Sequence, residues 1–310
     1  MTPRRVGLIA IGSNSARMLT ADLDPYLSNP VRGREETALF LSLDDKLRFS
    51  LEAMQRVAAA VSRLWHQAID AGAQEVRMIA TSAMRDAANR HELDLYIAAL
   101  CPIMLNRIIS GQEEALLSFL GACCIPPQQG LLGMIDIGGG STEVALGTAS
   151  EGLLSAHSLQ LGASRLLKTQ RVDNLEDIAL ARYIADKTIE EYLPIPSEQA
   201  GRWTLVGGTG TTLLGLITGL PQGQALPEGY GISRDRVSFW LRKLAPLTPE
   251  QRAQVPGMPA ARVHITLTGL VILEALFERL DLPEITVSLR NNLDGYLYRL
   301  YTNPLEDADA

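Results

Sequence analysis

Three short glycine-rich segments carry the residue types that bind phosphate groups. They are Gly12-Ser13-Asn14-Ser15, Gly138-Gly139-Gly140-Ser141-Thr142 and Gly207-Gly208-Thr209. Because glycine has no β-carbon, the backbone can come close to a ligand and turn its N–H groups toward phosphate oxygens. The third segment is expected to open a helix, whose N-terminus favours an anion. A single turn of this kind is often only a turn, but three at symmetric places predict a phosphate-binding cleft.

Two adjacent acids, Glu113 and Glu114, are candidates for a base that activates water. They lie in Ser110-Gly111-Gln112-Glu113-Glu114-Ala115, which predicts a short loop that leads into a helix over 113–121. The neighbouring Glu113 points about 100° away on a helix, so only one of the two acids faces a given side. Acids in a first helical turn also suit the helix dipole, which leaves a purely structural interpretation open.

Two further acids flank the second glycine turn, one on each predicted strand. Asp136 and Glu143 are our candidate metal ligands, since hard carboxylate oxygens suit Mg²⁺. Asp136 lies between Ile135 and Ile137, and a carboxylate in an apolar strand needs a cation or hydrogen-bond donors beside it. A hydrogen bond from the turn amides to Asp136 is the structural alternative.

Three arginines follow predicted turns and are candidates to bind phosphate oxygens. They are Arg17, Arg85 and Arg165. The planar guanidinium group donates two parallel hydrogen bonds to an oxyanion. Strand alternation places Arg17 on the same face as Ser15. For each arginine, a solvated surface position is the alternative.

The glycine turns belong to an internal repeat. Residues 9–19 align with 135–145, and residues 76–82 align with 203–209 at nearly the same offset. Each half then predicts a hairpin, a third strand, a helix and a further strand. The third strands are expected near 36–43 and over 152–161, and the helices over 51–71 and from 163 onward. This order of elements predicts a duplicated α/β fold.

Composition narrows the class of protein. The 310 residues carry 28 Lys+Arg against 35 Asp+Glu, a net charge of −7, which argues against a generally basic nucleic-acid binder. With 46% hydrophobic residues, the chain has material for two domains, and no apolar run approaches the roughly 18–20 residues of a membrane span. Three cysteines, an odd number, argue against a disulfide framework and for the reducing cytoplasm. The Pro- and Gly-containing stretch 125–130 marks a domain boundary.

Taken together, these motifs resemble the exopolyphosphatase/guanosine pentaphosphate phosphatase (Ppx/GppA) family, in its short two-domain form, of the actin/sugar kinase/Hsp70 superfamily. The resemblance runs from about residue 6 to 298. It rests on segments 11–15, 80–89, 109–115, 136–143, 161–165 and 207–209.

The resemblance implies two actin-like (ribonuclease H-like) domains with a cleft between them. We expect residues 1–124 to form the first domain, rejoined by a C-terminal helix within 293–310, and 125–292 to form the second. It implies divalent-metal-dependent hydrolysis of terminal phosphoryl groups of polyphosphate or guanosine pentaphosphate, with the catalytic carboxylate at Glu114. A homodimer is expected because relatives often form one. The apolar helix over 266–280 suits either the dimer interface or the core.

Three positions depart from the family pattern. Ala10 replaces an Asp, and the repeat shows the same difference because Ala10 aligns with Asp136. Arg262-Val263-His264 replaces Arg-Ala-Asp, and Asn292-Leu293-Asp294-Gly295 replaces Leu-Arg-Glu-Gly. The alternative to an active phosphatase is therefore a catalytically weakened protein that binds polyphosphate or guanosine penta- or tetraphosphate. A kinase of the same superfamily has less support, and the sequence does not separate the two substrates.

Overall fold

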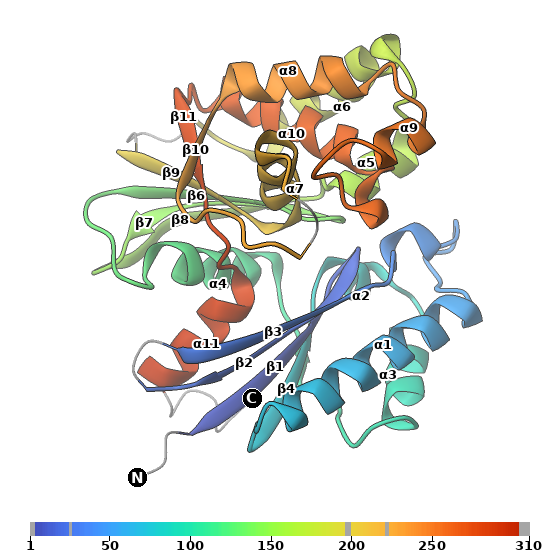
Figure 1. The fold of residues 1–310 in the computed structure, drawn as a ribbon, viewed down its shortest axis with the longest axis vertical. Coiled ribbons are helices and arrows are strands. Elements are labelled where there is room, and N and C mark those ends of the chain that lie inside the picture. Colours follow the sequence, from blue (N-terminus) through green and yellow to red (C-terminus); the bar gives the residue numbers. More distant parts are fainter. Residues whose placement is uncertain (1–3, 25–26, 196–199, 221–222, 304–310) are drawn as a thin grey trace. The chain divides into compact units, whose positions relative to one another are not determined.

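Two mixed β-sheets, one in each half of the chain, organise the fold. A computed structural model describes residues 4–24, 27–195, 200–220 and 223–303 (Figure 1). Unit 1 comprises the described residues up to Gly121 together with those from Asn292 onward, and unit 2 comprises Ala122–Asn291. The part of the expected C-terminal helix range 293–310 that follows residue 303 lies outside the described residues.

The sheet of unit 1 has five strands. Its order is β3-β2-β1-β4-β5. The strands are β1 (Arg5–Ile11), β2 (Ser15–Asp22), β3 (Ser28–Glu36), β4 (Glu75–Ala80) and β5 (Arg107–Ile108). The first three strands are antiparallel neighbours, and β4 and β5 run parallel to β1.

The sheet of unit 2 repeats this pattern and adds one strand. Its order is β10-β11-β9-β6-β7-β8. The strands are β6 (Leu132–Ile137), β7 (Thr142–Thr148), β8 (Gly152–Leu159), β9 (Arg202–Val206), β10 (Tyr230–Ser233) and β11 (Glu284–Val287). Strands β6 to β8 are antiparallel, β9 and β11 run parallel to β6, and the additional β10 is an antiparallel edge. The duplicated α/β fold predicted from the repeat is confirmed.

Unit 1 also contains helices. They are α1 (Leu51–Asp70), α2 (Ser82–Asp86), α3 (Arg90–Ala98), α4 (Gly111–Cys123) and α11 (Asn292–Thr302). The side chain of Ser50 accepts a hydrogen bond from the N–H of Ala53 and so caps α1. The apolar face of α1 packs on Ile9 and Met18. Helix α11 packs on β1 and β2, so the C-terminal helix belongs to unit 1.

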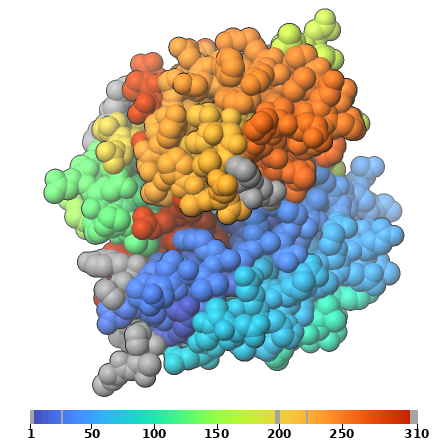
Figure 2. All heavy atoms as spheres, in the orientation of Figure 1, coloured from blue at the N-terminus to red at the C-terminus, as the bar shows by residue number. Residues whose placement is uncertain are grey.

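The core of unit 2 is built around α10. The helices are α5 (Ala163–Thr169), α6 (Leu175–Tyr192), α7 (Gly207–Thr218), α8 (Arg234–Leu244), α9 (Pro249–Ala253) and α10 (Thr266–Arg279). Helix α10 packs against α5, α6, α7 and α8, and nearly all of its residues are buried, so the apolar segment 266–280 is a core helix. Helix α8 lies at the surface of its unit (orange in Figure 2). No helix in the described chain has the length and apolar character needed to cross a membrane.

The third strand predicted over 36–43 is wrong. The strand β3 ends at Glu36, and Phe40–Ser42 forms a 3₁₀ turn whose Phe40 is buried with Leu39 and Leu43. An edge strand needs only one paired side and tolerates a polar sequence such as that of β3. The apolar run marks core residues of a loop instead of a strand.

Candidate functional site

The turn of the first hairpin presents two backbone N–H groups. The N–H of Gly12 donates to the carbonyl of Ser15 at 3.0 Å and closes the turn. Carbonyls of Ser13 and Asn14 accept hydrogen bonds from the segment after β3, and the Asn14 amide donates to Glu36 at 3.1 Å. Within the described chain, the N–H groups of Ser13 and Asn14 have no protein acceptor, so the turn is fixed while these donors remain available to an anion.

The turn of the second hairpin has the same geometry. The N–H of Gly138 donates to the carbonyl of Ser141 at 3.0 Å, and the N–H groups of Gly139 and Gly140 lack an acceptor among the described residues. The hydroxyl of Thr142 is buried and donates to the carbonyl of Leu161. The side chain of Thr142 is therefore structural, and the turn presents the backbone amides of Gly139 and Gly140.

The first residues of helix α5 hold the second turn through hydrogen bonds. The N–H groups of its first residues, Ala163, Ser164 and Arg165, donate to the carbonyls of Gly138 and Gly139 at 2.8–2.9 Å. A β-carbon on Gly162 would lie 2.5 Å from backbone atoms of Gly139, so only glycine fits there. The N–H groups at the start of α5 thus bind carbonyl oxygens of the turn, and the N–H groups of the turn face away from α5.

The guanidinium group of Arg165 also holds this turn. It donates to the carbonyl of Gly140 at 2.6 Å and to Gln160 Oε1 at 2.8 Å. The predicted contact of Arg165 with phosphate stays a prediction, and the structure shows its guanidinium group holding the carbonyl side of the turn.

The two predicted metal ligands lie directly opposite each other. In the register of β6 and β7, Asp136 pairs with Glu143, so both side chains are on one face of the sheet. Both are buried, with 6% and 1% of their surface exposed. Ser158 Oγ donates to Glu143 Oε1 at 2.9 Å. Two carboxylates this close repel each other and favour a bound cation or proton.

The third glycine turn contacts this carboxylate pair. Gly207 begins α7 with φ of +79°, and a β-carbon there would lie 2.3 Å from Asp136 Oδ1. Thr209 Oγ1 donates to the carbonyl of Ile137 at 3.2 Å. Unit 2 therefore brings together the second and third turns with Asp136 and Glu143.

The equivalent pair in the first hairpin has different chemistry. Ala10 lies opposite Arg17 in the register of β1 and β2, as Asp136 lies opposite Glu143. Arg17 Nη2 donates to Asn292 Oδ1 of α11 at 3.1 Å. Where unit 2 carries two acids, unit 1 carries an alanine and a cation.

Unit 1 brings Glu114 together with Arg85. Glu114 is 7% exposed, and Arg85 Nη1 donates to its Oε2 and to the carbonyl of Ile109, each at 2.9 Å. Arg85 was predicted to bind phosphate, and the structure places its guanidinium on the candidate base. The arginine therefore sets the orientation of the Glu114 carboxylate.

Sequence reasoning did not assign a role to two residues beside these elements. Arg262 was noted only as part of a departing motif, yet a β-carbon on Gly208 would lie 1.6 Å from its Nη2, so its guanidinium covers the third turn. Asn292 holds Arg17, and its Nδ2 is buried without a partner among the described residues. Neither residue had a signal in the sequence, because Arg262 lies far along the chain from Gly208 and Asn292 is 275 positions from Arg17.

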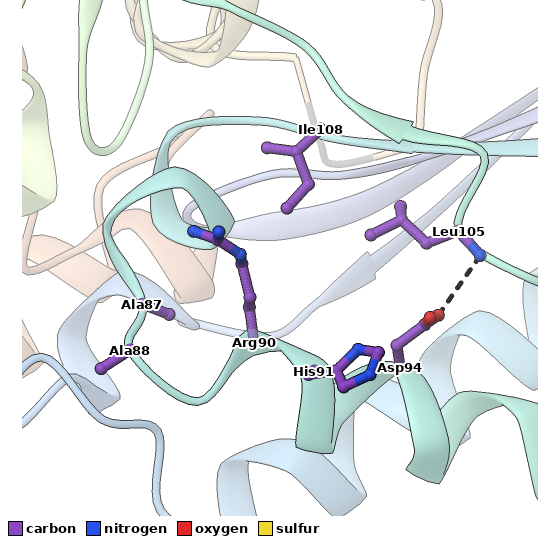
Figure 3. A pocket seen from close by; sticks show the side chains of 7 residues that line it. All are labelled: Ala87, Ala88, Arg90, His91, Asp94, Leu105 and Ile108. Carbon is purple, nitrogen blue, oxygen red and sulfur yellow. Dashed lines mark hydrogen bonds between the residues drawn. The ribbon is translucent and has the colours of Figure 1, made fainter. Parts of the chain in front are cut away.

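A pocket of 510 Å³ on unit 1 contains none of the predicted site residues (Figure 3). It is lined by Ala87, Ala88, Arg90, His91, Asp94, Leu105 and Ile108. Asp94 Oδ1 accepts a hydrogen bond from the N–H of Leu105 at 3.2 Å, and Arg90 Nη1 donates to the carbonyl of Arg85 at 3.4 Å.

Only two carboxylates are grouped in the candidate metal site. No cluster of three or more His, Cys, Asp or Glu side chains suited to a metal occurs in the residues that the structure describes. Mg²⁺ commonly uses one or two carboxylates and completes its coordination with water and substrate phosphates. The donor set of Asp136 and Glu143 fits that kind of site.

The chain matches known proteins over nearly its whole length. The family model described as the Ppx/GppA phosphatase family matches residues 31–303. Exopolyphosphatase 2 of Mycobacterium tuberculosis is 31% identical over 326 residues, which cover 95% of this chain and 98% of the relative. The guanosine-5'-triphosphate,3'-diphosphate pyrophosphatase of Aeromonas salmonicida is 29% identical, and the match covers 97% of this chain but only 60% of that longer relative.

Solved structures show the same fold. The crystal structure of an exopolyphosphatase-like protein superposes with a TM-score of 0.90 at 24% identity, covering 98% of this chain and all of the other. With duplicated α/β units, the same strand directions in both and a family match that spans most of the sequence, the chain belongs to the Ppx/GppA phosphatase family.

Proposed function

We propose that the chain hydrolyses the terminal phosphoanhydride bond of polyphosphate or guanosine pentaphosphate and that it uses a divalent cation, Mg²⁺ by preference. Its class, a phosphoanhydride phosphohydrolase, follows from family membership and from the activities named for its relatives. The proposal goes beyond family membership in two respects, which are the metal ion and the substrates. They are supported by the side chains around the glycine turns.

The observation that carries the proposal is the buried pair of Asp136 and Glu143 next to Gly207. Two acids on one face of a sheet flank a turn whose Gly139 and Gly140 amides have no acceptor among the described residues, and this arrangement suits a cation that is shared with phosphate oxygens. When bound, such a cation neutralises charge on the phosphoryl group. The amides of Gly139 and Gly140 are assigned to the same oxygens.

Glu114 is assigned the role of general base. The oxygen of a water molecule attacks the terminal phosphorus, the bridging P–O bond breaks, and its electron pair leaves with the shortened chain. The proton that the water loses passes to the Glu114 carboxylate. Arg85, bonded to Oε2 of Glu114, keeps that carboxylate in one orientation.

Phosphate release tests the function directly. We expect the purified protein to release orthophosphate from polyphosphate or guanosine pentaphosphate with Mg²⁺, to stop when EDTA is in excess, and to resume when Mg²⁺ is restored. Release that is equally fast in EDTA would contradict the proposed metal. If neither substrate yields phosphate while both bind, the hydrolase assignment is wrong.

One specific observation favours a second candidate, a protein that binds polyphosphate or a guanosine alarmone with weakened catalysis. The first hairpin lacks the acid that the second one has, and it places Ala10 opposite Arg17. The guanidinium group of Arg17 attracts phosphate, whereas the absence of an acid at position 10 leaves one oxygen fewer for a metal ion. Binding would then be retained better than turnover.

Replacing Ala10 distinguishes the two candidates. We expect Ala10→Asp to raise phosphatase activity several-fold at limiting Mg²⁺, because the new carboxylate adds an oxygen donor. The position is fully buried, but Arg17 lies directly opposite and would pair with the new charge. The measurement is the initial rate as a function of Mg²⁺.

Ala10→Asn is the matched control, since it has the same shape without the charge and should give no gain. Unchanged activity in Ala10→Asp together with weaker polyphosphate binding would favour the binding protein over the enzyme.

Assembly and location remain part of the proposal. A homodimer follows from the resemblance alone. A cytoplasmic location is supported by three free thiols, all buried. Burial raises the pKa of Cys123 to about 12, with a contribution from the neighbouring Cys124, whose own pKa burial raises to about 11. These thiols stay protonated and poorly reactive at neutral pH.

A further inference from the structure

Two arginines from distant parts of unit 1 bind Glu113, the residue before the candidate base. Arg299 Nη2 of α11 donates to Glu113 Oε1 at 3.1 Å, and the guanidinium of Arg107 on β5 donates to Oε2. The Glu113 side chain is only 13% exposed, and that of Arg299 is 19% exposed. Both carboxylate oxygens are thus held in a largely enclosed ion pair.

The backbones of α11 and α4 touch one turn further along. A β-carbon on Gly295 would lie 1.8 Å from the carbonyl oxygen of Leu117. Gly295 is four residues before Arg299, and Leu117 is four residues after Glu113, so both contacts lie on the facing sides of the two helices. Figure 1 shows α11 next to α4 in unit 1. The C-terminal helix is therefore attached to α4 at two points.

The first turn of α4 connects this attachment to Glu114. The N–H of Glu113 donates to Ser110 Oγ at 3.1 Å, and the N–H of Glu114 donates to the Ser110 carbonyl at 2.9 Å. Ser110 and Glu113 have the spacing of a capping box, in which the acid would fold back on the helix start. Here the Glu113 carboxylate binds Arg107 and Arg299 instead, so this acid links α4 to β5 and α11.

We propose that Arg299 is a positioning residue for the hydrolytic reaction, which it serves by fixing Glu113 and with it the helical turn that carries Glu114. The inference rests on the proposed function for its effect on rate. Glu114 is then held from two sides, by Arg85 at its carboxylate and by α11 through the adjacent residue. The same helix holds Arg17 through Asn292 and Arg32 through Asp294. Helix α11 thereby ties the first hairpin to the turn of the base.

The test compares Arg299→Ala with a matched control in the same unit. Arg5 pairs with Asp22 at 2.8 Å, and these side chains are 17% and 14% exposed, close to the values for Arg299 and Glu113. Arg5→Ala therefore removes an equally enclosed ion pair without touching α4. Each variant is assayed for kcat and KM, for thermal unfolding, and for amide hydrogen exchange of residues 110–116.

We expect Arg299→Ala to lower kcat roughly 10- to 100-fold, the scale of a small misplacement of a catalytic group, with KM changed less than about twofold. Arg299→Lys should recover part of the rate, because a lysine can still pair with Glu113. Exchange of residues 110–116 should become faster in Arg299→Ala and stay unchanged in Arg5→Ala.

A wild-type kcat in Arg299→Ala, or a loss of kcat equal to that in Arg5→Ala, would overturn the proposal. Unchanged exchange in Arg299→Ala would also overturn it. If the wild-type protein releases no phosphate at all, the proposed function fails, and faster exchange confined to Arg299→Ala would still support the link between α11 and the turn of Glu114.

Discussion

Glu114→Gln should bind polyphosphate as the wild-type protein does and lose turnover by roughly 10²–10⁴-fold, the usual contribution of a positioned acid or base. Glutamine keeps the length of the side chain and an oxygen that can accept the hydrogen bond from Arg85. The Arg85 contact at 2.9 Å therefore survives while the proton acceptor is removed. Single-turnover phosphate release and equilibrium binding of polyphosphate measure the two properties separately.

Asp22→Asn is the control for this substitution. Asp22 is also a carboxylate that pairs with an arginine of unit 1, and the exposed fractions of the two side chains are similar, 14% for Asp22 and 10% for Glu114. Its hydrogen bonds from Asn29 and Arg5 hold the pKa of Asp22 below its ordinary value, so the variant loses stability at neutral pH but should keep its kcat. Near wild-type turnover in Glu114→Gln would remove Glu114 from the role of base.

The parts of the fold that a local pattern encodes could be predicted from the sequence. The two hairpins repeat an apolar run, a small-residue turn and a second apolar run, and the structure gives both turns the same closing hydrogen bond at 3.0 Å. Helix α1 has strong apolar periodicity and was predicted within one residue of its end. The edge strand β3 was misplaced, because a strand paired on one side and open on the other needs no apolar run.

Contacts between residues far apart in the chain could not be predicted in this way. Arg17 and Asn292 are 275 positions apart, and no periodicity links an asparagine at a helix start to a strand arginine. The sequence places Arg85 and Arg165 after predicted turns, but their acceptors, Glu114 and the Gly140 carbonyl, depend on tertiary packing. Arginine position is visible in a sequence, whereas arginine partners are not.

The duplicated hairpins differ in the chemistry of one pair of opposed residues. Ala10 and Arg17 give the first copy a cation without an acid, while Asp136 and Glu143 give the second copy two acids. Both copies keep two turn amides without a protein acceptor in the described chain. This difference suits the proposed division of tasks, in which the turn amides of both hairpins bind phosphate oxygens and the two acids of unit 2 are the ligands of the Mg²⁺ ion.

Asp136→Asn should therefore raise the Mg²⁺ concentration for half-maximal activity by at least about 10- to 100-fold, the scale on which even a partner of a metal ligand changes affinity. The substitution removes one of two opposed buried acids and leaves Glu143, with its hydrogen bond from Ser158, in place. A metal titration of phosphate release gives the shift. A lower rate with an unchanged Mg²⁺ dependence would mean that Asp136 acts by another route, such as holding the turn amides.

Gly207→Ala tests the same ligand without changing its charge. The new β-carbon would approach Asp136 Oδ1 to 2.3 Å and must displace that carboxylate. Gly130→Ala is its matched control, since Gly130 has φ of +81° against +79° for Gly207 but no atom within 4 Å of a new β-carbon. Both variants carry the same backbone strain of about 1–2 kcal/mol. We expect only Gly207→Ala to shift the Mg²⁺ titration, because only there does the added methyl group move the proposed metal ligand Asp136, and an equal shift in both variants would assign the effect to strain.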